Sequence, residues 1–149
     1  MNPDFCDMLA ALCAENAEFM IVGAYALAAH GLPRATGDID IWVRSTKENA
    51  QNVWNALKRF RAPLSDLSLD DLQTPDVVFQ IGAAPRRIDI LTSISGVAFE
   101  SAWPSRKITR LAGLDVPVIG RLDLLRNKRA AGRAQDLIDA QRLEDHPSD

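Results

Sequence analysis

Asp38 and Asp40 lie two positions apart in the apolar segment DIDIWV, where neither charge suits burial. In a β-strand, side chains at positions i and i+2 project from the same face, about 6.5 Å apart. The two carboxylates would share one face, and Ile39, Ile41 and Val43 would point into a core on the other. Two ionised carboxylates this close repel each other unless a cation offsets their charge. The pair therefore predicts a divalent-cation site, and hard oxygen ligands favour Mg²⁺ or Mn²⁺.

A third aspartate, Asp89, has the same setting between two isoleucines of RRIDILTSI. Adjacent strands lie about 4.8 Å apart, so Asp89 would join Asp38 and Asp40 if its strand lies beside theirs. Three carboxylates could then surround two ions about 3.5–4 Å apart, as in two-metal phosphoryl or nucleotidyl transfer. The alternative is that the aspartates face solvent on an edge strand or pair with arginines such as Arg34 and Arg86.

A glycine turn precedes the aspartate pair by 15 residues. The segment EFMIVG predicts a buried strand that passes through Gly23 and Ala24 into the short helical segment AYALAAHG. Such a turn exposes backbone N–H groups at a helix N-terminus, which suits a phosphate group. A single glycine at a strand end is more often structural, but its place before the paired aspartates makes it part of a phosphate-binding pattern.

The elements that must position these residues follow from hydrophobic periodicity and turn signals. Helices are expected over 3–17, 24–31, 45–60, 96–103, 121–132 and 133–146, the last two divided at Gly132. Strands are expected over 18–23, 38–43, 76–82 and 86–94, with two more around Gly113, and residues 61–75 are expected to form a loop. This order predicts one α/β domain over 1–149, with a mixed β-sheet flanked by helices and a helical C-terminus.

The bulk composition is that of a globular protein, with 47% hydrophobic and 25% charged residues. The net charge of −3 argues against a general nucleic-acid coat protein but allows a local basic patch. No apolar run approaches the roughly 18 residues that span a bilayer, and no signal peptide is expected, so we expect a cytoplasmic protein without membrane contact. Cys6 and Cys13 lie about 10 Å apart on one predicted helix, too far for a disulfide.

The segment VGAYALAAHGLPRATGDIDIWV resembles the start of the nucleotidyltransferase fold shared with DNA polymerase beta. In that superfamily a strand ends in a small-residue turn, a short helix follows, the next strand carries D-x-D, and a third acidic residue comes later. These positions are matched here by Gly23, Asp38, Asp40 and Asp89. Ala24 stands where Gly or Ser is usual, which keeps the backbone N–H but lacks a hydroxyl. The resemblance implies a polymerase beta-like fold and metal-dependent nucleotidyl transfer.

A closer likeness is to small bacterial nucleotidyltransferases related to abortive-infection toxins. Their His-Gly and Arg-x-Thr motifs are matched by His30-Gly31, Arg34 and Thr36. Their later basic and acidic helical signature is matched by NKRAAGRAQDLIDA, through Lys128, Arg133, Asp136 and Asp139. The resemblance implies an NTP substrate and an acceptor hydroxyl on RNA or protein. In a toxin–antitoxin or phage-defence setting it also implies an antitoxin partner. The nucleotide-binding residues would be Gly23, Ala24, Arg34, Thr36, Lys128, Arg133 and Asp136.

Several of these residues also have a plain structural explanation. The basic span that includes Lys128, Arg129 and Arg133 is either a solvated helix face or a surface for phosphates, and Asp136 could orient one of its cations. Arg34 would contact a phosphate or fix one of the paired aspartates. His30 is more readily a helix-end cap or hydrogen-bonded support. Trp42 either packs in the core or flanks a nucleobase.

Three functions compete. The first is a nucleotidyltransferase in which Asp38 and Asp40 hold both metals and Asp89 holds the catalytic metal and helps to deprotonate the acceptor. The second is a non-catalytic nucleotide-binding or partner-binding module that retains the fold. The third is a Mg²⁺-dependent nuclease, which is disfavoured because RIDIL lacks the acidic-x-Lys pair common in nucleases. The acceptor, the base and the oligomeric state are left open.

Overall fold

A six-stranded mixed sheet forms the centre of the computed structural model, which describes residues 1–146. Its strands are β1 (Phe19–Val22), β2 (Ile39–Val43), β3 (Val78–Ala83), β4 (Arg86–Leu91), β5 (Lys107–Leu111) and β6 (Leu114–Val118). Their spatial order is β3-β4-β2-β1-β6-β5. The helices are α1 (Pro3–Ala14), α2 (Gly23–Ala29), α3 (Lys47–Phe60), α4 (Phe99–Ala102), α5 (Arg121–Ala131) and α6 (Ala134–Asp145).

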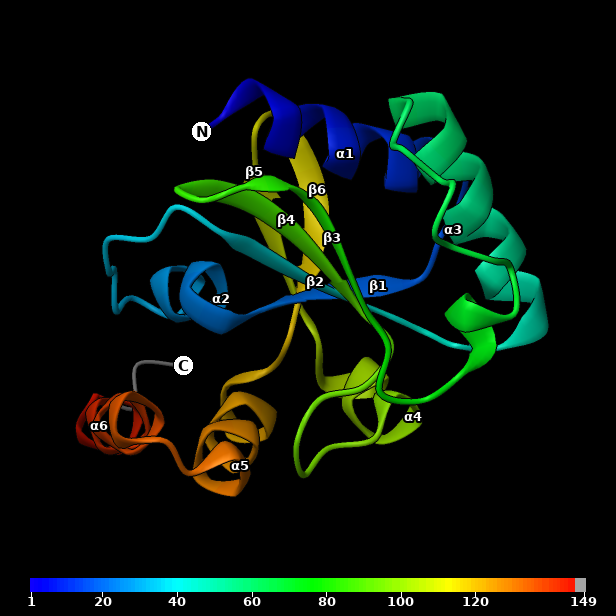
Figure 1. The fold of residues 1–149 in the computed structure, drawn as a ribbon. Coiled ribbons are helices and arrows are strands. Elements are labelled where there is room, and N and C mark those ends of the chain that lie inside the picture. The colour runs from blue at the N-terminus through cyan, green and yellow to red at the C-terminus, as the bar shows by residue number, and fades with distance from the viewer. Residues whose placement is uncertain (147–149) are drawn as a thin grey trace.

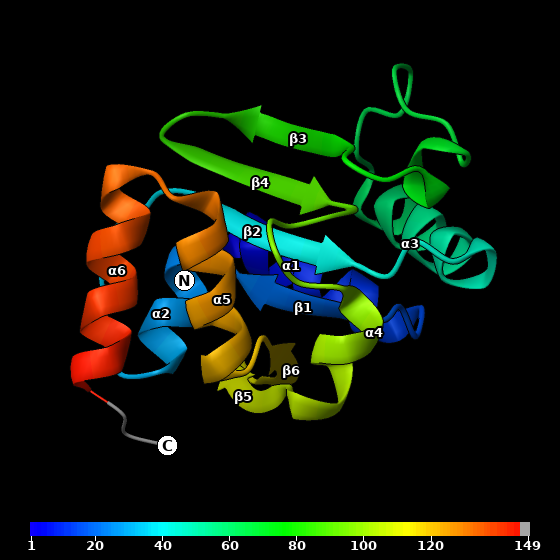
Figure 2. The same ribbon diagram turned by 90° about the horizontal axis from the view of Figure 1, so that it is seen from below.

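Helices cover both faces of the sheet. Figure 1 shows α1 and α3 packed on one face, and α2, α4, α5 and α6 on the other. In the turned view of Figure 2, α2, α5 and α6 lie together over one end of the strands, while α4 lies over the other end. The site residues come mainly from the start of α2, the loop before β2, strands β2 and β4, and the α5–α6 pair, so this helix layer forms one wall of the site.

The long helices begin and end where the sequence supplies caps. Asn2 accepts a hydrogen bond from the Asp4 backbone N–H at 2.7 Å and starts α1, and Thr46 accepts one from Asn49 at 3.3 Å and starts α3. Gly132, at φ +70°, ends α5 in the left-handed conformation that a glycine adopts without steric cost. The turn after Gly132 brings α6 back against α5.

The strand register places the aspartates side by side. Strand β2 pairs with β4 in parallel, with Asp40 opposite Asp89, and with β1 in antiparallel fashion, with Asp40 opposite Val22. Ile39 and Ile41, which alternate with Asp40, are fully buried. Alternation along the strand therefore directs the isoleucines into the core and the aspartates to the opposite face.

The predicted α/β architecture with its mixed sheet and helical C-terminus is confirmed, and residues 1–146 form a single compact domain. The first helix ends at Ala14 rather than at residue 17, and β2 begins at Ile39, so Asp38 immediately precedes the strand. The predicted loop over 61–75 contains one short 3-10 turn, Asp71–Gln73.

Cys6 and Cys13 are free thiols, as expected. None of the helices within residues 1–146 combines the length and the apolar character needed to cross a membrane.

Candidate functional site

The three predicted carboxylates line one cavity of about 540 Å³. Asp40 and Asp89 are direct neighbours across β2 and β4, and Asp38 lies one residue before β2. The Thr36 hydroxyl Oγ1 lies 3.2 Å from both the backbone nitrogen and the carbonyl oxygen of Asp38, and so brackets the residue from the preceding loop. The sheet thus fixes two carboxylates and a local turn fixes the third.

Arg87 holds two of these carboxylates together. Its Nε and Nη2 donate to the two carboxylate oxygens of Asp89 at 2.7 and 3.1 Å, and Nη2 also lies 3.3 Å from Asp38 Oδ2. The backbone N–H of Arg87 donates to Asp38 Oδ1 at 3.1 Å. Its guanidinium group therefore offsets part of the negative charge at the site.

Asp40 remains the least neutralised member of the cluster. Burial, together with the charges of Asp89 and Asp38 and a hydrogen bond shared with Asp89, raises the pKa of Asp40 from 3.8 to about 6. Lys128 acts in the opposite direction but does not outweigh these effects. Burial thus opposes ionisation of Asp40 most strongly, and the neighbouring carboxylates add to this effect.

Gly23 is required by the close approach of Asp40. A Cβ at Gly23 would lie 2.2 Å from Asp40 Oδ2, and the residue has φ +70°, which favours glycine. Ala24 follows in the first turn of α2, which has no side-chain cap, and both residues line the carboxylate cavity. The predicted turn between β1 and α2 therefore lies directly against the carboxylates.

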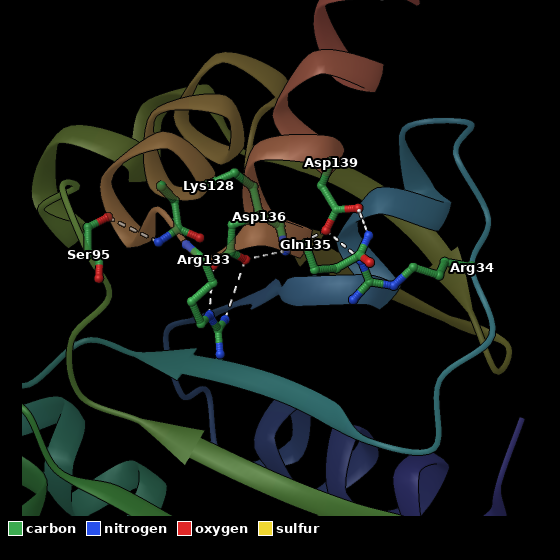
Figure 3. A network of polar contacts seen from close by, with 8 residues as sticks. Arg34, Ser95, Lys128, Arg133, Gln135, Asp136 and Asp139 are labelled. Carbon is green, nitrogen blue, oxygen red and sulfur yellow. Dashed lines mark hydrogen bonds and ion pairs between the residues drawn. The ribbon is translucent and has the colours of Figure 1, made fainter.

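A polar network on α5 and α6 (Figure 3) borders the same cavity as the three carboxylates. Lys128 Nζ lies 3.4 Å from Asp136 and 3.1 Å from Asp139, and all three residues are at most 5% exposed. Arg133 Nε donates to Asp136 at 2.7 Å, and its guanidinium group projects from the α5–α6 junction toward the sheet. Arg34, from the loop before β2, pairs with Asp139. These contacts hold three cations at the cavity wall.

The two acidic residues of this network stay ionised because cations surround them. Burial alone would raise the pKa of Asp136, but hydrogen bonds and charge from Arg133 and Lys128 outweigh it and lower the pKa. Burial opposes ionisation of Asp139 in the same way, and hydrogen bonds from Arg34, Gln135 and Lys128 lower its pKa. Both aspartates therefore act as fixed anions that orient the cations.

All the residues predicted to bind metal or nucleotide line this one cavity, although their roles stay predictions. They are Gly23, Ala24, Arg34, Thr36, Asp38, Asp40, Asp89, Lys128, Arg133 and Asp136. The prediction that Asp136 orients one of the cations agrees with its contacts to Lys128 and Arg133.

Other expectations need correction. Arg34 fixes Asp139 and not Asp38 or Asp40. The nucleobase alternative for Trp42 is wrong because its side chain is 1% exposed and packs edge-to-face on Phe99 in the core.

The sequence predicts that the basic residues of α5 form either a solvated helix face or a surface for phosphates. The solvated-face alternative does not hold for Lys128, which is buried, whereas Arg129 pairs with Glu144 and Arg126 pairs with Asp123 at 3.1 Å. His30 has its structural role: it caps the C-terminus of α2, and its Nε2 lies 2.7 Å from the carbonyl oxygen of Ile119.

Arg87 and Gln135 are site residues that the sequence prediction missed. Arg86, which the alternative explanation names as a partner of the aspartates, is exposed and makes none of these contacts. Alternation along β4 supplies the missed signal, since Arg87 lies two residues before Asp89 and shares its face. Gln135 donates to Asp139 at 2.9 Å.

The fold is that of nucleotidyltransferases. TM1012 of Thermotoga maritima, described as a candidate nucleotidyltransferase, aligns over 93% of this chain and 86% of its own, with TM-score 0.55 and 16% identity. The antibiotic-resistance factor ANT(2'')-Ia in solution aligns over 94% of this chain and 80% of its own, with TM-score 0.60 and 16% identity. ANT(2'')-Ia in complex with adenylyl-2''-tobramycin aligns with TM-score 0.54 and 16% identity, over 93% of this chain and 84% of its own.

Sequence comparison alone does not find this relationship. No protein-family profile matches the chain, and no curated protein matches it either. At 16% identity the structural neighbours establish the fold, and the predicted polymerase beta-like architecture is thereby confirmed. The closer likeness to abortive-infection proteins stays a prediction.

Proposed function

We propose that this protein transfers a nucleoside monophosphate from an NTP to an acceptor hydroxyl, with release of pyrophosphate. The observation that carries the proposal is the convergence of three carboxylates on one cavity, where burial and the neighbouring carboxylates raise the pKa of Asp40 to about 6. The cations at the α5–α6 wall lie across the same cavity, where they would meet a triphosphate. Nucleotidyltransferases among the structural neighbours support the same reaction class.

The donor set fits Mg²⁺ or Mn²⁺, although within residues 1–146 no three acidic, His or Cys side chains converge as a finished metal site. Asp40 would supply the first oxygen ligand, and Asp38 and Asp89 would join it if the partly exposed Arg87 side chain, which pairs with both, turned away. When bound, the ion would polarise the phosphate under attack and favour ionisation of the acceptor hydroxyl.

The chain's own groups have separate tasks in this proposal. Asp89 lies beside Asp40 at the cavity and would accept the proton of the acceptor hydroxyl once Arg87 no longer occupies both of its oxygens. Arg133 and Lys128 would hold the triphosphate, with Asp136 fixing their directions. The first N–H groups of α2, at Gly23 and Ala24, would donate to a phosphate oxygen.

The acceptor class belongs to the same proposal. RNA or protein hydroxyls follow from the sequence resemblance, as do the toxin–antitoxin or phage-defence setting and an antitoxin partner. One structural neighbour was solved with adenylyl-2''-tobramycin, which adds a small-molecule hydroxyl to the acceptors that should be tested.

A second candidate is a nucleotide-binding module without transferase activity. The contacts of Arg87 favour it, because the guanidinium group already neutralises Asp38 and Asp89 without a metal. Such a module would bind an NTP through Lys128 and Arg133 and would need no divalent ion.

The deciding experiment measures NTP binding by calorimetry, with Mn²⁺ and with EDTA, for the wild type, Asp40→Asn and Asp115→Asn. Asp115 is an exposed aspartate on β6 that pairs with Arg110, and it serves as the matched control. Metal-dependent binding that only Asp40→Asn abolishes supports the transferase. Equal binding in EDTA and in Mn²⁺ favours the module. Labelled NTPs with cellular RNA, protein and aminoglycosides then test transfer itself.

A further inference from the structure

A second cavity, of about 780 Å³, lies at the other ends of α2 and α5 from the carboxylates. The C-terminal cap of α2, the turn before β5 and the first turns of α5 border it. Its lining contains the cations Arg106, Lys107, Arg121 and Arg126 and one acidic residue, Asp123. The whole chain has 17 Lys and Arg against 20 Asp and Glu, so this lining is more basic than the chain as a whole.

Arg106 and Arg121 are oriented by contacts with neutral groups, which do not neutralise their charges. The guanidinium carbon of Arg106 lies 3.9 Å from the ring centroid of Trp103, and its Nη1 donates to the Trp103 carbonyl oxygen at 2.8 Å. Arg121 Nη1 donates to the carbonyl oxygen of Leu143 at 3.1 Å. Within residues 1–146 neither arginine forms an ion pair. Each guanidinium has five N–H donors, so most remain for an anion.

The start of α5 adds to the positive potential. The N-cap residue of this 11-residue helix is Gly120, which has no side chain to accept a hydrogen bond. The first backbone N–H groups of α5 therefore border the cavity without a capping side chain. A Cβ at Gly120 would lie 2.5 Å from the carbonyl oxygen of Ser105. This tight contact brings the start of α5 against the turn that carries Arg106.

We propose that the second cavity is a binding site for phosphate groups, with Arg106 and Arg121 as its charged donors. Planar guanidinium groups match phosphate oxygens in pairs, and here they are oriented before any ligand arrives. The phosphates belong either to a free anion such as pyrophosphate or to the backbone of an RNA strand. Arg121 and Lys128 lie seven residues apart on α5, about 10 Å, so a strand held here could continue toward the carboxylate cavity. The site does not depend on the proposed transferase activity.

The test measures binding of two probes in EDTA: a fluorescent single-stranded RNA by anisotropy, and pyrophosphate by calorimetry. Arg106→Gln and Arg121→Gln remove a charge, and glutamine at 121 keeps a donor for Leu143. Each should weaken binding of at least one probe about tenfold at low salt and lower the slope of log affinity against log salt by about 1. Loss for RNA alone assigns the phosphates to a polymer, and loss for pyrophosphate as well assigns them to free anions.

Arg110→Gln is the matched control, since Arg110 lies on β5 outside the cavity and pairs with Asp115 at 3.1 Å. Arg106→Lys and Arg121→Lys should retain most of the binding because they keep the charge. Circular dichroism and thermal midpoints establish that each variant is folded. If one of the two glutamine variants does not fold, the other is sufficient to test the proposal. Wild-type affinity in both glutamine variants, or an equal loss in Arg110→Gln, would overturn the proposal.

Discussion

Gly23 and Asp40 are in such close contact that no side chain fits between them. A Cβ at Gly23 would lie 2.2 Å from Asp40 Oδ2 and 3.2 Å from its carboxyl carbon. Gly23 directly follows β1, and the last residue of that strand, Val22, is the register partner of Asp40. The turn that begins α2 and the carboxylate that faces the cavity therefore depend on each other.

Replacing Gly23 with alanine should damage both the fold and the site. Gly23→Ala forces φ +70° on a residue with a Cβ, at a cost of about 1–3 kcal/mol, and displaces the Asp40 carboxylate. Gly113→Ala is the control, because Gly113 has φ +76° and a Cβ added there would meet no atom within 4 Å. Urea unfolding should show a similar loss of unfolding free energy from backbone strain in both variants, and a further loss in Gly23→Ala from the contact with Asp40. Metal-dependent NTP binding should be lost only in Gly23→Ala.

The stability of the metal-free protein should depend on Asp40 in a predictable direction. Its folded-state pKa is raised to about 6, so the stabilisation from its protonated form is present below about pH 4 and is lost as the pH rises through 6. Asp40→Asn has no charge to gain. It should therefore be more stable than the wild type at about pH 8, by at most about 3 kcal/mol, and should differ little at about pH 4. Urea titrations in EDTA at the two pH values measure this, and a variant less stable at both would show that the carboxylate is structural.

Asp89 should be separable from the other two carboxylates by function. Asp38→Asn and Asp40→Asn should abolish metal-dependent NTP binding, because both residues are expected to hold the triphosphate-side ion. Asp89→Asn should still bind the nucleotide but transfer it at a rate reduced by roughly 10²–10⁴, the usual value of general-base help. Calorimetry and a transfer assay are compared for each variant. If Asp89→Asn loses nucleotide binding as completely as Asp38→Asn, the division of roles is wrong.

The α5–α6 network should stabilise the protein through Asp139. Asp139→Asn leaves the buried Lys128 and the partly buried Arg34 with one anion fewer, and should cost about 3–5 kcal/mol. Glu144 lies on α6 like Asp139 and is an exposed partner of Arg129 on α5, so Glu144→Gln should cost at most about 1 kcal/mol. Thermal and urea unfolding distinguish the two. Equal, small losses would mean that Lys128 does not need Asp139.

Period-two alternation predicts the direction of the two strand carboxylates. Asp40 and Asp89 each lie between two isoleucines, and a strand that buries one face must expose the other, whereas the turn at Thr36 fixes Asp38 just before β2. Glycine turns and caps such as Gly132 and Thr46 likewise mark the helix ends. These signals are local, which is why the sequence carries them.

Long-range side-chain contacts could not be predicted in the same way. Arg34 and Asp139 are 105 positions apart, and their pairing depends on how the loop before β2 approaches α6. The basic residues of α5 look alike in sequence, yet Lys128 is buried between two carboxylates while Arg129 remains half exposed. Only the packing of α6 against α5 decides which cation is buried.

The pairing of β2 on both sides also has a consequence for folding. A shift of β2 by one residue against β1 and β4 would turn Asp40 into the hydrophobic layer beneath α1 and α3, and would bring Ile39 and Ile41 to the cavity. Burial of a charge without a partner adds a large cost to the lost strand contacts. The carboxylate that is destabilised in the native site thus also penalises this misaligned sheet, so a chain without it should be more stable when folded at about pH 8 but less certain of its alignment on the way there.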